Sequence, residues 1–273
     1  DTMLTIQPGY EVAPDGTAYD VFCKTDAPVV VLIHGLGLCR HMWHDHIAYF
    51  APDYQVVSYD LLGHGDSIAP TAPTDLSLYA RQLCDLLDHL QIDKAAVVGF
   101  SIGGMINRRF ALDYADRLSA LAILNSPHDR GDEAQHLVEA RAAAVRSEGA
   151  MATMEAALER WFTDEYRTSH SDFMETVRAW RRQVDAQSYA EAAWVLATGV
   201  KELTRPTTPV SVPTIVITSE NDSGSTPDMA ATIAGEIDQA EICIVPELKH
   251  LGLMEQPQSF TAPVIDFFRK LPL

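Results

Sequence analysis

The sequence predicts an α/β fold, in which a mainly parallel, twisted sheet is flanked by helices and carries a helical insertion. Two observations lead to this prediction. Short apolar runs alternate with amphipathic segments over residues 28–126, which is the pattern of βαβ units joined by right-handed crossovers. Residues 127–213 then lack apolar strand runs, before two further runs and a helix follow in residues 214–273. We therefore expect a core of residues 1–126 and 214–273, interrupted by a helical subdomain of residues 127–213.

Length and composition agree with one large domain of this class. The chain has 273 residues, of which 47% are hydrophobic and 8% aromatic, and these values argue against disorder, collagen or a coiled coil. A formal net charge of −18 would repel polyanions over the whole surface. Because no basic stripe offsets this charge, we expect no nucleic-acid partner.

The sequence carries no recognisable targeting or membrane segment. No apolar run approaches the roughly 20 residues that cross a bilayer, and the first residues lack a basic region followed by an apolar core. Position 1 is not a methionine, which leaves room for a removed leader. The four cysteines lie far apart in the sequence, and no two of them have the close spacing that is typical of a metal site or a redox-active pair: Cys23, Cys39, Cys84 and Cys243. We expect a cytoplasmic protein with free thiols and no membrane partner.

The core elements are predicted from their apolar patterns. Residues 3–23 carry alternating apolar patches around a turn at residues 14–16, which favours an antiparallel hairpin at a sheet edge. Continuous apolar runs at residues 28–33 and 55–60 are typical of parallel strands covered on both faces. The other expected core elements are helices near residues 42–50, 76–90 and 102–114, strands at 95–98, 118–124, 214–218 and 241–245, and a last helix from Pro257.

The insertion is predicted to be helical. Its segments are rich in Ala, Glu and Arg, and the expected helices cover residues 133–148, 151–162, 173–184 and 189–198. Residues 205–213 contain three prolines, at positions 206, 209 and 213, and this composition favours neither a helix nor a central strand. We interpret this stretch as the return to the sheet.

The stretch Gly99-Phe100-Ser101-Ile102-Gly103 places a serine between a strand and a helix. A side chain on so tight a turn leaves no room for neighbouring side chains, and glycine adopts the required torsions at little cost. The pattern predicts that Ser101 is exposed on a strained turn, where it could act as a nucleophile.

A serine hydroxyl needs a base to remove its proton and an acid to orient that base. Asp222 follows the predicted strand at residues 214–218, and His250 follows the one at residues 241–245. The order Ser, Asp, His is the one expected for a serine on such a turn, and both partners follow the carboxyl ends of parallel strands. Glu220 is the alternative acid, with Asp222 preferred.

Two backbone N–H groups are candidates for holding an oxyanion: that of Ile102, directly after the serine, and that of Leu36 in the Gly-rich turn after the first parallel strand. We interpret His34 and Asp60 as residues that brace their turns. Three histidines share the first predicted helix without an accompanying carboxylate pattern: His41, His44 and His46. We therefore expect no metal site and no cofactor.

Taken with these residues, the chain resembles the α/β-hydrolase superfamily over nearly its whole length. Four pieces carry the resemblance: the turn at residues 34–37, the Gly-His-Gly-Asp-Ser turn at residues 63–67, the serine turn, and the segment that begins at His250. Gly103-Gly104-Met105 and the segment at residues 159–163 are similar to the 3-oxoadipate enol-lactonase group. That group tends to have Asn-Ser-Leu-Gly where this chain has His-Gly-Leu-Gly.

The resemblance implies that residues 127–213 form a cap over Ser101. Three cap residues are expected to contact substrate: Met154, Trp161 and Trp194. A substrate that bears a carboxylate would need a positive group, and four cap arginines could supply it, with none assigned: Arg160, Arg178, Arg181 and Arg182.

The sequence therefore predicts a serine hydrolase that cleaves a carboxylic ester or lactone through an acyl-enzyme, with a small molecule as its partner. Ser101 would be the nucleophile, His250 the base and Asp222 the acid. Two alternatives stay open: a carbon–carbon bond hydrolase with the same three residues, and a binding module that keeps the fold without turnover. The oligomeric state is not predicted.

Overall fold

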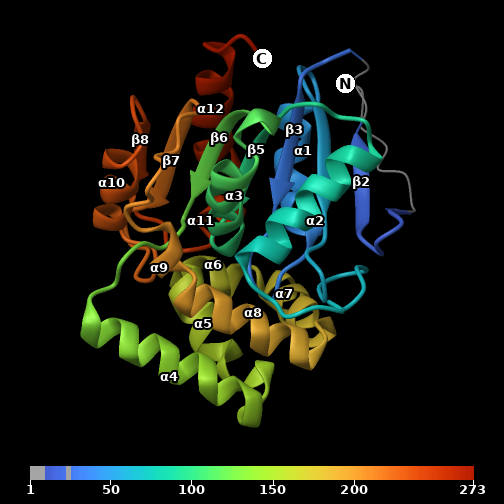
Figure 1. The fold of residues 1–273 in the computed structure, drawn as a ribbon. Helices are drawn as coiled ribbons and strands as arrows, with labels where there is room; N and C mark the ends of the chain where they lie inside the picture. The colour runs from blue at the N-terminus through green and yellow to red at the C-terminus, as the bar shows by residue number, and fades with distance from the viewer. Residues whose placement is uncertain (1–9, 23–25) are drawn as a thin grey trace.

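The computed structural model describes residues 10–22 and 26–273, and it contains an eight-stranded sheet in the order β1-β2-β4-β3-β5-β6-β7-β8 (Figure 1). The strands β1 and β2 are antiparallel, and the other six run parallel. Their bounds are Glu11–Val12, Ala18–Phe22, Val29–Ile33, Gln55–Tyr59, Ala95–Phe100, Leu118–Leu124, Thr214–Ser219 and Glu241–Val245 for β1 to β8. The predicted α/β fold is confirmed, and so is the edge hairpin within residues 10–22, while residues 3–9 of the predicted hairpin lie outside the described residues. Cys23 lies outside the described residues.

The central strands are apolar on both faces because both faces are covered. Every residue of β5 is buried, as are the last four of β3 and six of the seven in β6. In register, Ile33 pairs with Gly99, and Phe100 pairs with Leu124. This pairing brings the carboxyl ends of three strands to one edge of the sheet, directly before the predicted serine turn.

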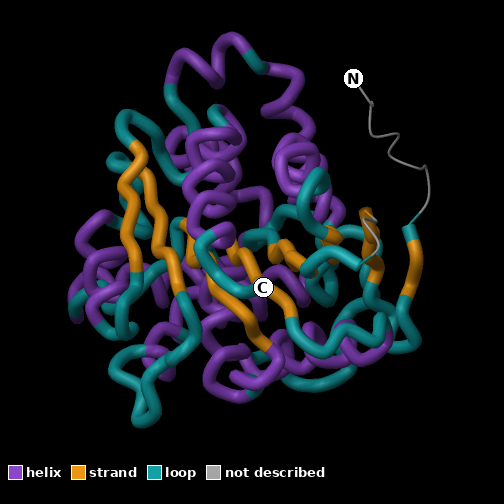
Figure 2. Tube along the Cα trace, turned by 90° about the horizontal axis from the view of Figure 1, so that it is seen from above, coloured by secondary structure: helices purple, strands orange, loops and turns teal. Residues whose placement is uncertain are grey.

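Helices cover the sheet on both sides (Figures 1 and 2). One apolar cluster joins the sheet to α2, α3 and α10, and a second joins its other face to α1 and α12. These helices span Leu76–His89, Ile102–Asp113, Pro227–Gly235, His44–Phe50 and Pro257–Arg269, and the short α11 spans Gly252–Glu255. Apolar residues at helical spacing on each inner face explain the packing.

Between β6 and β7 the chain forms six helices: α4 Asp132–Glu148, α5 Met154–Trp161, α6 Asp164–Ser169, α7 Ser171–Gln183, α8 Ala186–Thr198 and α9 Val200–Leu203. Most of them form a layer at the carboxyl ends of the strands (Figure 1). The short α9 instead packs beside α3, and Val210 belongs to the sheet cluster, so the last part of residues 127–213 packs with the core.

The helix α6 and a late start of α5 differ from the sequence prediction. Residues 150–153 form a 3-10 turn before α5. The polar segment of α6 shows little apolar periodicity, but the Thr163 hydroxyl accepts a hydrogen bond from the Tyr166 amide and caps its first turn. Tyr166 then stacks on Phe162, so tertiary packing completes the helix. Among the described residues, no helix is long and apolar enough to cross a membrane.

Candidate active site

The turn after β5 holds Ser101 in a conformation that few residues adopt. Its φ is 56°, in the left-handed region, so the predicted strain is present. The predicted exposure is wrong: Ser101 is only 5% exposed. A Cβ on Gly99 would meet the backbone of Gly103, and a Cβ on Gly103 would lie 2.5 Å from the Ile33 carbonyl oxygen. The Ser101 amide donates to the Leu124 carbonyl at 2.9 Å. Neighbouring strands and close backbone packing therefore fix the serine at the carboxyl edge of the sheet.

Asp222 and His250 meet at the same edge. The distance from His250 Nδ1 to Asp222 Oδ2 is 2.6 Å, and Asp222 is 3% exposed. The other carboxylate oxygen, Oδ1, accepts hydrogen bonds from the Gly224 and Ser225 amides at 3.1 and 2.9 Å. A buried carboxylate is stable when its lone pairs are satisfied in this way. Because Nδ1 faces the carboxylate, Nε2 is the ring nitrogen free to accept a proton.

A third polar side chain, Asn125, also binds the Asp222 carboxylate. Its Nδ2 donates to Asp222 Oδ2 at 2.9 Å and to Ser219 Oγ at 3.1 Å, and its φ is 48°. From the sequence alone, Asn125 is set aside as an orienting group, because an amide carries no charge. The available signal was its position directly after β6, where it faces the loop after β7.

Glu220, the alternative acid, is engaged elsewhere. Its carboxylate accepts a hydrogen bond from the Glu247 amide at 2.8 Å, and its residue is exposed. This contact ties the loop after β7 to the loop after β8. Of the two carboxylates that the sequence offered, the structure brings only Asp222 to His250.

Ser101, Asp222 and His250 line one cavity of about 200 Å³ beneath the helical layer. The Phe100 ring lies 4.9 Å from the His250 ring, centroid to centroid, and the Trp161 ring lies 6.2 Å from it. A hydrogen bond of 2.9 Å from the Leu251 amide to the Trp161 carbonyl joins the histidine loop to α5. The cavity is therefore enclosed by both the core and the insertion.

Two backbone amides, those of Leu36 and Ile102, are the candidate oxyanion donors next to Ser101 and its cavity. Leu36 is part of its wall, and Ile102 is the first residue of α3, where helix N–H groups lack intrahelical acceptors. Among the described residues, neither amide donates a backbone hydrogen bond outside its own element. Both N–H groups are thus available to an oxygen atom bound near Ser101, and the positive end of the α3 dipole favours negative charge there.

Of the three expected substrate contacts, only Trp161 lines the cavity. Met154 is 1% exposed and belongs to the core cluster behind α5. Trp194 is 40% exposed on the outer side of α8, where Ala193 and Ala197 face the cavity instead. The expectation for Met154 and Trp194 is therefore corrected: the rotation of each helix, which depends on its neighbours, turns these side chains away.

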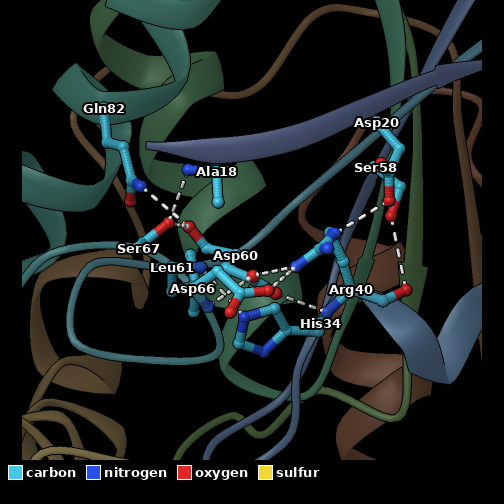
Figure 3. A network of polar contacts seen from close by, with 10 residues as sticks. All are labelled: Ala18, Asp20, His34, Arg40, Ser58, Asp60, Leu61, Asp66, Ser67 and Gln82. Carbon is cyan, nitrogen blue, oxygen red and sulfur yellow. Dashed lines mark hydrogen bonds and ion pairs between the residues drawn. The ribbon is translucent and has the colours of Figure 1, made fainter. Parts of the chain in front are cut away.

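His34 braces its turn, as the sequence analysis suggested. One ring nitrogen, Nδ1, lies 2.7 Å from the Gly35 carbonyl oxygen, and the other, Nε2, accepts a hydrogen bond of 2.9 Å from the Leu61 amide (Figure 3). Burial lowers the pKa of His34 to about 4. The ring is therefore neutral at neutral pH and connects the turns after β3 and β4.

Asp60 sits in a buried ionic network with Arg40, a residue that the sequence analysis did not identify (Figure 3). The Arg40 guanidinium forms ion pairs with Asp60 at 2.5 Å, with Asp20 at 2.8 Å and with Asp66 at 2.8 Å. The network ties β2, the end of β4 and the Gly-rich turn together. Its role is to fix the loops beside the cavity rather than to contact a ligand.

Three histidines lie close together in the sequence at the start of α1: His41, His44 and His46. In the part of the chain that the structure describes, no three side chains that could bind a metal ion lie close enough together to do so. His46 is buried, and its two ring nitrogens lie 2.6 Å from Thr261 Oγ1 and 2.8 Å from the Leu253 carbonyl oxygen. His41 and His44 are exposed. His46 is therefore packed in the protein interior, apart from the two exposed histidines.

Comparisons with known proteins agree with this architecture. A family model for the alpha/beta hydrolase fold matches residues 28–257. The 3-oxoadipate enol-lactonase 2 of Acinetobacter baylyi is 30% identical over 246 residues, which cover 90% of each chain. The (E)-2-((N-methylformamido)methylene)succinate hydrolase of the same organism is 26% identical over 87% of this chain and 89% of its own.

Solved structures give the same result. The enol-lactonase from Burkholderia xenovorans LB400 superposes with a TM-score of 0.85 at 27% identity, covering 96% of this chain and 100% of that one. A thermophilic esterase from Thermogutta terrifontis superposes with a TM-score of 0.77 at 26% identity, covering 93% of each chain. With its sheet order, its strained serine turn and these similarities, the chain belongs to the α/β-hydrolase fold family and is a hydrolase related to enol-lactonases.

Proposed function

We propose that this protein is a serine hydrolase that cleaves a carboxylic ester or lactone through an acyl-enzyme. One observation carries the proposal: the 2.6 Å contact between His250 and Asp222 lies in the wall of the cavity that also contains Ser101. A nucleophile, a base and an orienting carboxylate in one enclosed site are the parts that acyl transfer requires.

In the first half of the reaction, His250 Nε2 removes the proton of Ser101 as the hydroxyl oxygen attacks the substrate carbonyl carbon. Asp222 holds the ring in the tautomer with Nδ1 protonated and stabilises the imidazolium that forms. The amides of Leu36 and Ile102 donate to the oxyanion of the tetrahedral intermediate. His250 then gives its proton to the leaving alkoxide, which departs and leaves the acyl group on Ser101.

In the second half, His250 removes a proton from water, and the hydroxide oxygen attacks the acyl carbon. Collapse of the second tetrahedral intermediate releases the carboxylic acid and returns the proton to Ser101. For a lactone, the leaving alkoxide stays attached to the acyl chain, so a single product is released. The complete cycle consumes one water molecule and regenerates the Ser101 hydroxyl and the neutral His250 ring.

The preference for a lactone rests on similarity. Two of the relatives reported above are enol-lactonases by name, and Trp161, a cap residue expected to contact substrate, lines the cavity. A cavity of about 200 Å³ suits a small molecule. The His-Gly-Leu-Gly turn, in contrast, is the form commoner among esterases, so a neutral ester belongs in the same substrate panel.

The proposal is tested with purified variants and a panel of lactones and short esters. Ser101→Ala should lower kcat by about 10⁴-fold or more, because the three residues act as one unit. Asp222→Asn should have an effect of about 10⁴-fold, because the ring loses its orienting charge. Glu220→Gln is the matched control and should stay within a few-fold of the native protein. Turnover that survives in Ser101→Ala, or a larger loss in Glu220→Gln than in Asp222→Asn, would contradict the mechanism.

A further inference from the structure

A buried arginine, Arg108, lies on α3, seven residues after Ser101. It is 5% exposed, and its side chain donates hydrogen bonds to three uncharged acceptors: the Gly104 carbonyl oxygen at 2.9 Å, Ser126 Oγ at 2.8 Å and the Pro127 carbonyl oxygen at 2.8 Å. Burial lowers the pKa of Arg108 to about 9, so the guanidinium is still charged at neutral pH. The serine turn therefore has a buried positive charge next to it.

The hydrogen bonds of Arg108 leave its charge without an acidic partner in direct contact among the described residues. Glu236 is the acidic residue whose field acts on Arg108, but its carboxylate lies 3.0 Å from His128 Nε2 and pairs with that ring. A buried charge that forms no ion pair costs folding free energy. Packing alone does not account for an arginine here, which points to a role that uses its charge and its donors.

The Ser126 hydroxyl connects the Arg108 guanidinium to the serine turn. A guanidinium only donates hydrogen bonds, so Ser126 Oγ is the acceptor and its own proton is directed elsewhere. That proton goes to the Ser101 carbonyl oxygen, which lies 2.8 Å from Oγ. Gly104 makes this approach possible, because a Cβ there would lie 2.7 Å from Ser126 Cβ. The direction of both hydrogen bonds, from Arg108 to Ser126 to the turn, is therefore fixed.

The Ser101 carbonyl belongs to the same peptide unit as the Ile102 N–H group, which is a candidate oxyanion donor. Its oxygen also accepts hydrogen bonds from the amides of Gly104 at 2.9 Å and Met105 at 3.3 Å. Donors at the oxygen of a peptide unit polarise it and make its N–H group a stronger donor, and the effect passes along a chain of hydrogen bonds. The charge-assisted bond from Arg108 begins such a chain.

We propose that Arg108 and Ser126 form a hydrogen-bond relay that orients and polarises the Ser101–Ile102 peptide, and so strengthens the Ile102 N–H group as an oxyanion donor. This inference rests on the proposed function and deepens it. Neither side chain belongs to the lining of the Ser101 cavity, so both are positioning residues that act through the backbone. The relay is assembled before substrate binds, as electrostatic preorganisation requires.

Two ketones test the relay: a methyl ketone and a trifluoromethyl ketone that carry the same phenylethyl group. Ser101 adds to the carbonyl carbon of the fluorinated ketone, the Ser101 proton passes to His250, and the carbonyl oxygen becomes an oxyanion. The methyl ketone binds without this addition. We define the oxyanion preference as Ki for the methyl ketone divided by Ki for the trifluoromethyl ketone, both measured as inhibition of ester hydrolysis. An inactive fraction of a sample changes neither Ki.

Ser126→Ala should lower the oxyanion preference and kcat by about two- to eightfold. This range corresponds to a strengthening of about 10–30% in a donor whose removal costs about 10²- to 10³-fold in kcat. Arg108→Gln should lower the preference in the same direction, and Arg108→Lys should lower it less, because the positive charge is kept. Ser126→Ala changes only one hydroxyl, so it tests the relay even if replacing the buried arginine impairs folding.

The double variant Ser126→Ala/Arg108→Gln distinguishes a relay from two separate effects. If Arg108 acts through the Ser126 hydroxyl, the double variant should have the oxyanion preference of Ser126→Ala alone. Arg109→Gln is the matched control. It removes the same charge from the next position of α3, but Arg109 pairs with Asp113 and Glu202, so its preference should equal the native value.

The outcomes separate this inference from the proposed function. The relay is wrong, and the hydrolase function stands, if Ser126→Ala keeps the native oxyanion preference, if the losses of the two single variants multiply in the double variant, or if Arg109→Gln lowers the preference equally. A native protein that hydrolyses esters but binds both ketones equally well would also overturn the relay. If the native protein hydrolyses no member of the lactone and ester panel, the proposed function itself fails.

Discussion

At the scale of single residues, the candidate site depends on the individual hydrogen bonds that each side chain makes. Asp222 receives donors on both carboxylate oxygens, from His250 and Asn125 on Oδ2 and from backbone amides on Oδ1. Two donors on one oxygen compete for its electron density. Asn125 therefore weakens the acceptor that His250 uses, which makes it a positioning residue in our account.

Replacing Asn125 by glycine tests this role. Glycine adopts a φ of 48° without strain, so the change removes the Nδ2 donor while sparing the backbone. Asp222 Oδ2 then holds the His250 imidazolium more strongly. Because this imidazolium forms in the transition state, kcat/KM on the ester panel should rise, by about two- to threefold.

Ser219→Ala is the matched control for this prediction. It removes the second acceptor of the Asn125 amide, at 3.1 Å, and leaves the bond to Asp222 in place. Its kcat/KM should equal that of the native protein. An unchanged kcat/KM in Asn125→Gly, or the same change in both variants, would show that Asn125 only fills space.

The sequence predicted some of these residues and missed others for a physical reason. Ser101, Asp222 and His250 follow strand ends, and the order of parallel strands along the chain brings such positions together. Asn125 occupies the same kind of position, but an uncharged amide does not suggest an orienting role in a sequence. The positions of the Met154 and Trp194 side chains depend on how each helix is rotated, and helical periodicity alone does not set that rotation.

At the scale of secondary-structure elements, buried histidines connect segments that are distant in sequence. His46 joins α1 to the Thr261 hydroxyl on α12 and to the Leu253 carbonyl on α11. His34 connects two turns beside the cavity, and its ring lies 5.2 Å from that of His64. All three rings are buried, so each is packed in its neutral form.

These contacts make stability depend on pH in a predictable direction. Burial lowers the pKa of His34 and His46 to about 4 and that of His64 to about 3, against about 6.5 in an unfolded chain. Between these values the unfolded chain takes up protons that the folded protein does not. The free energy of unfolding should therefore fall as the pH drops from about 6.5 towards 4, by up to about 1.4 kcal/mol per histidine and pH unit.

Urea unfolding between pH 7.5 and 4.5 measures this dependence. His46→Gln removes one of the contributing groups and should flatten the slope by up to one proton, while His136→Gln on the exposed side of α4 should leave it unchanged. Equal slopes in the native protein and both variants would contradict the account. So would an unfolding free energy that rises as the pH falls below 6.5.

The elements themselves were predicted well where one physical cause dominates. Six parallel strands appear at the apolar runs, and for the five inner ones the reason is that a strand covered on both faces must be apolar throughout. The sixth, β8, lies at the sheet edge and is largely exposed. The helix α6 was missed because its stability comes from a cap and from ring packing rather than from periodicity. The return segment was interpreted as a connection only, yet Val210 packs with the sheet core, a contact that no local pattern reveals.

At the scale of the whole molecule, the site forms only when the core and the insertion come together. Four distant segments of the core supply the serine, the acid, the histidine and the Leu36 amide, and the insertion closes the cavity over them. A buried network around Arg40 and Asp60 fixes the neighbouring loops (Figure 3). Nucleophile activation is thus a property of the complete fold, and it is the central claim of our account.

Covalent labelling with a fluorophosphonate, followed by mass mapping of the peptides, tests that claim most directly. The native protein should take up one label on Ser101, Asp222→Asn should react more slowly by orders of magnitude, and Glu220→Gln should react like the native protein. Ser101→Ala should stay unlabelled. A native protein that hydrolyses esters while Ser101 remains unmodified, or a label that maps to another residue and is kept in Ser101→Ala, would contradict the account.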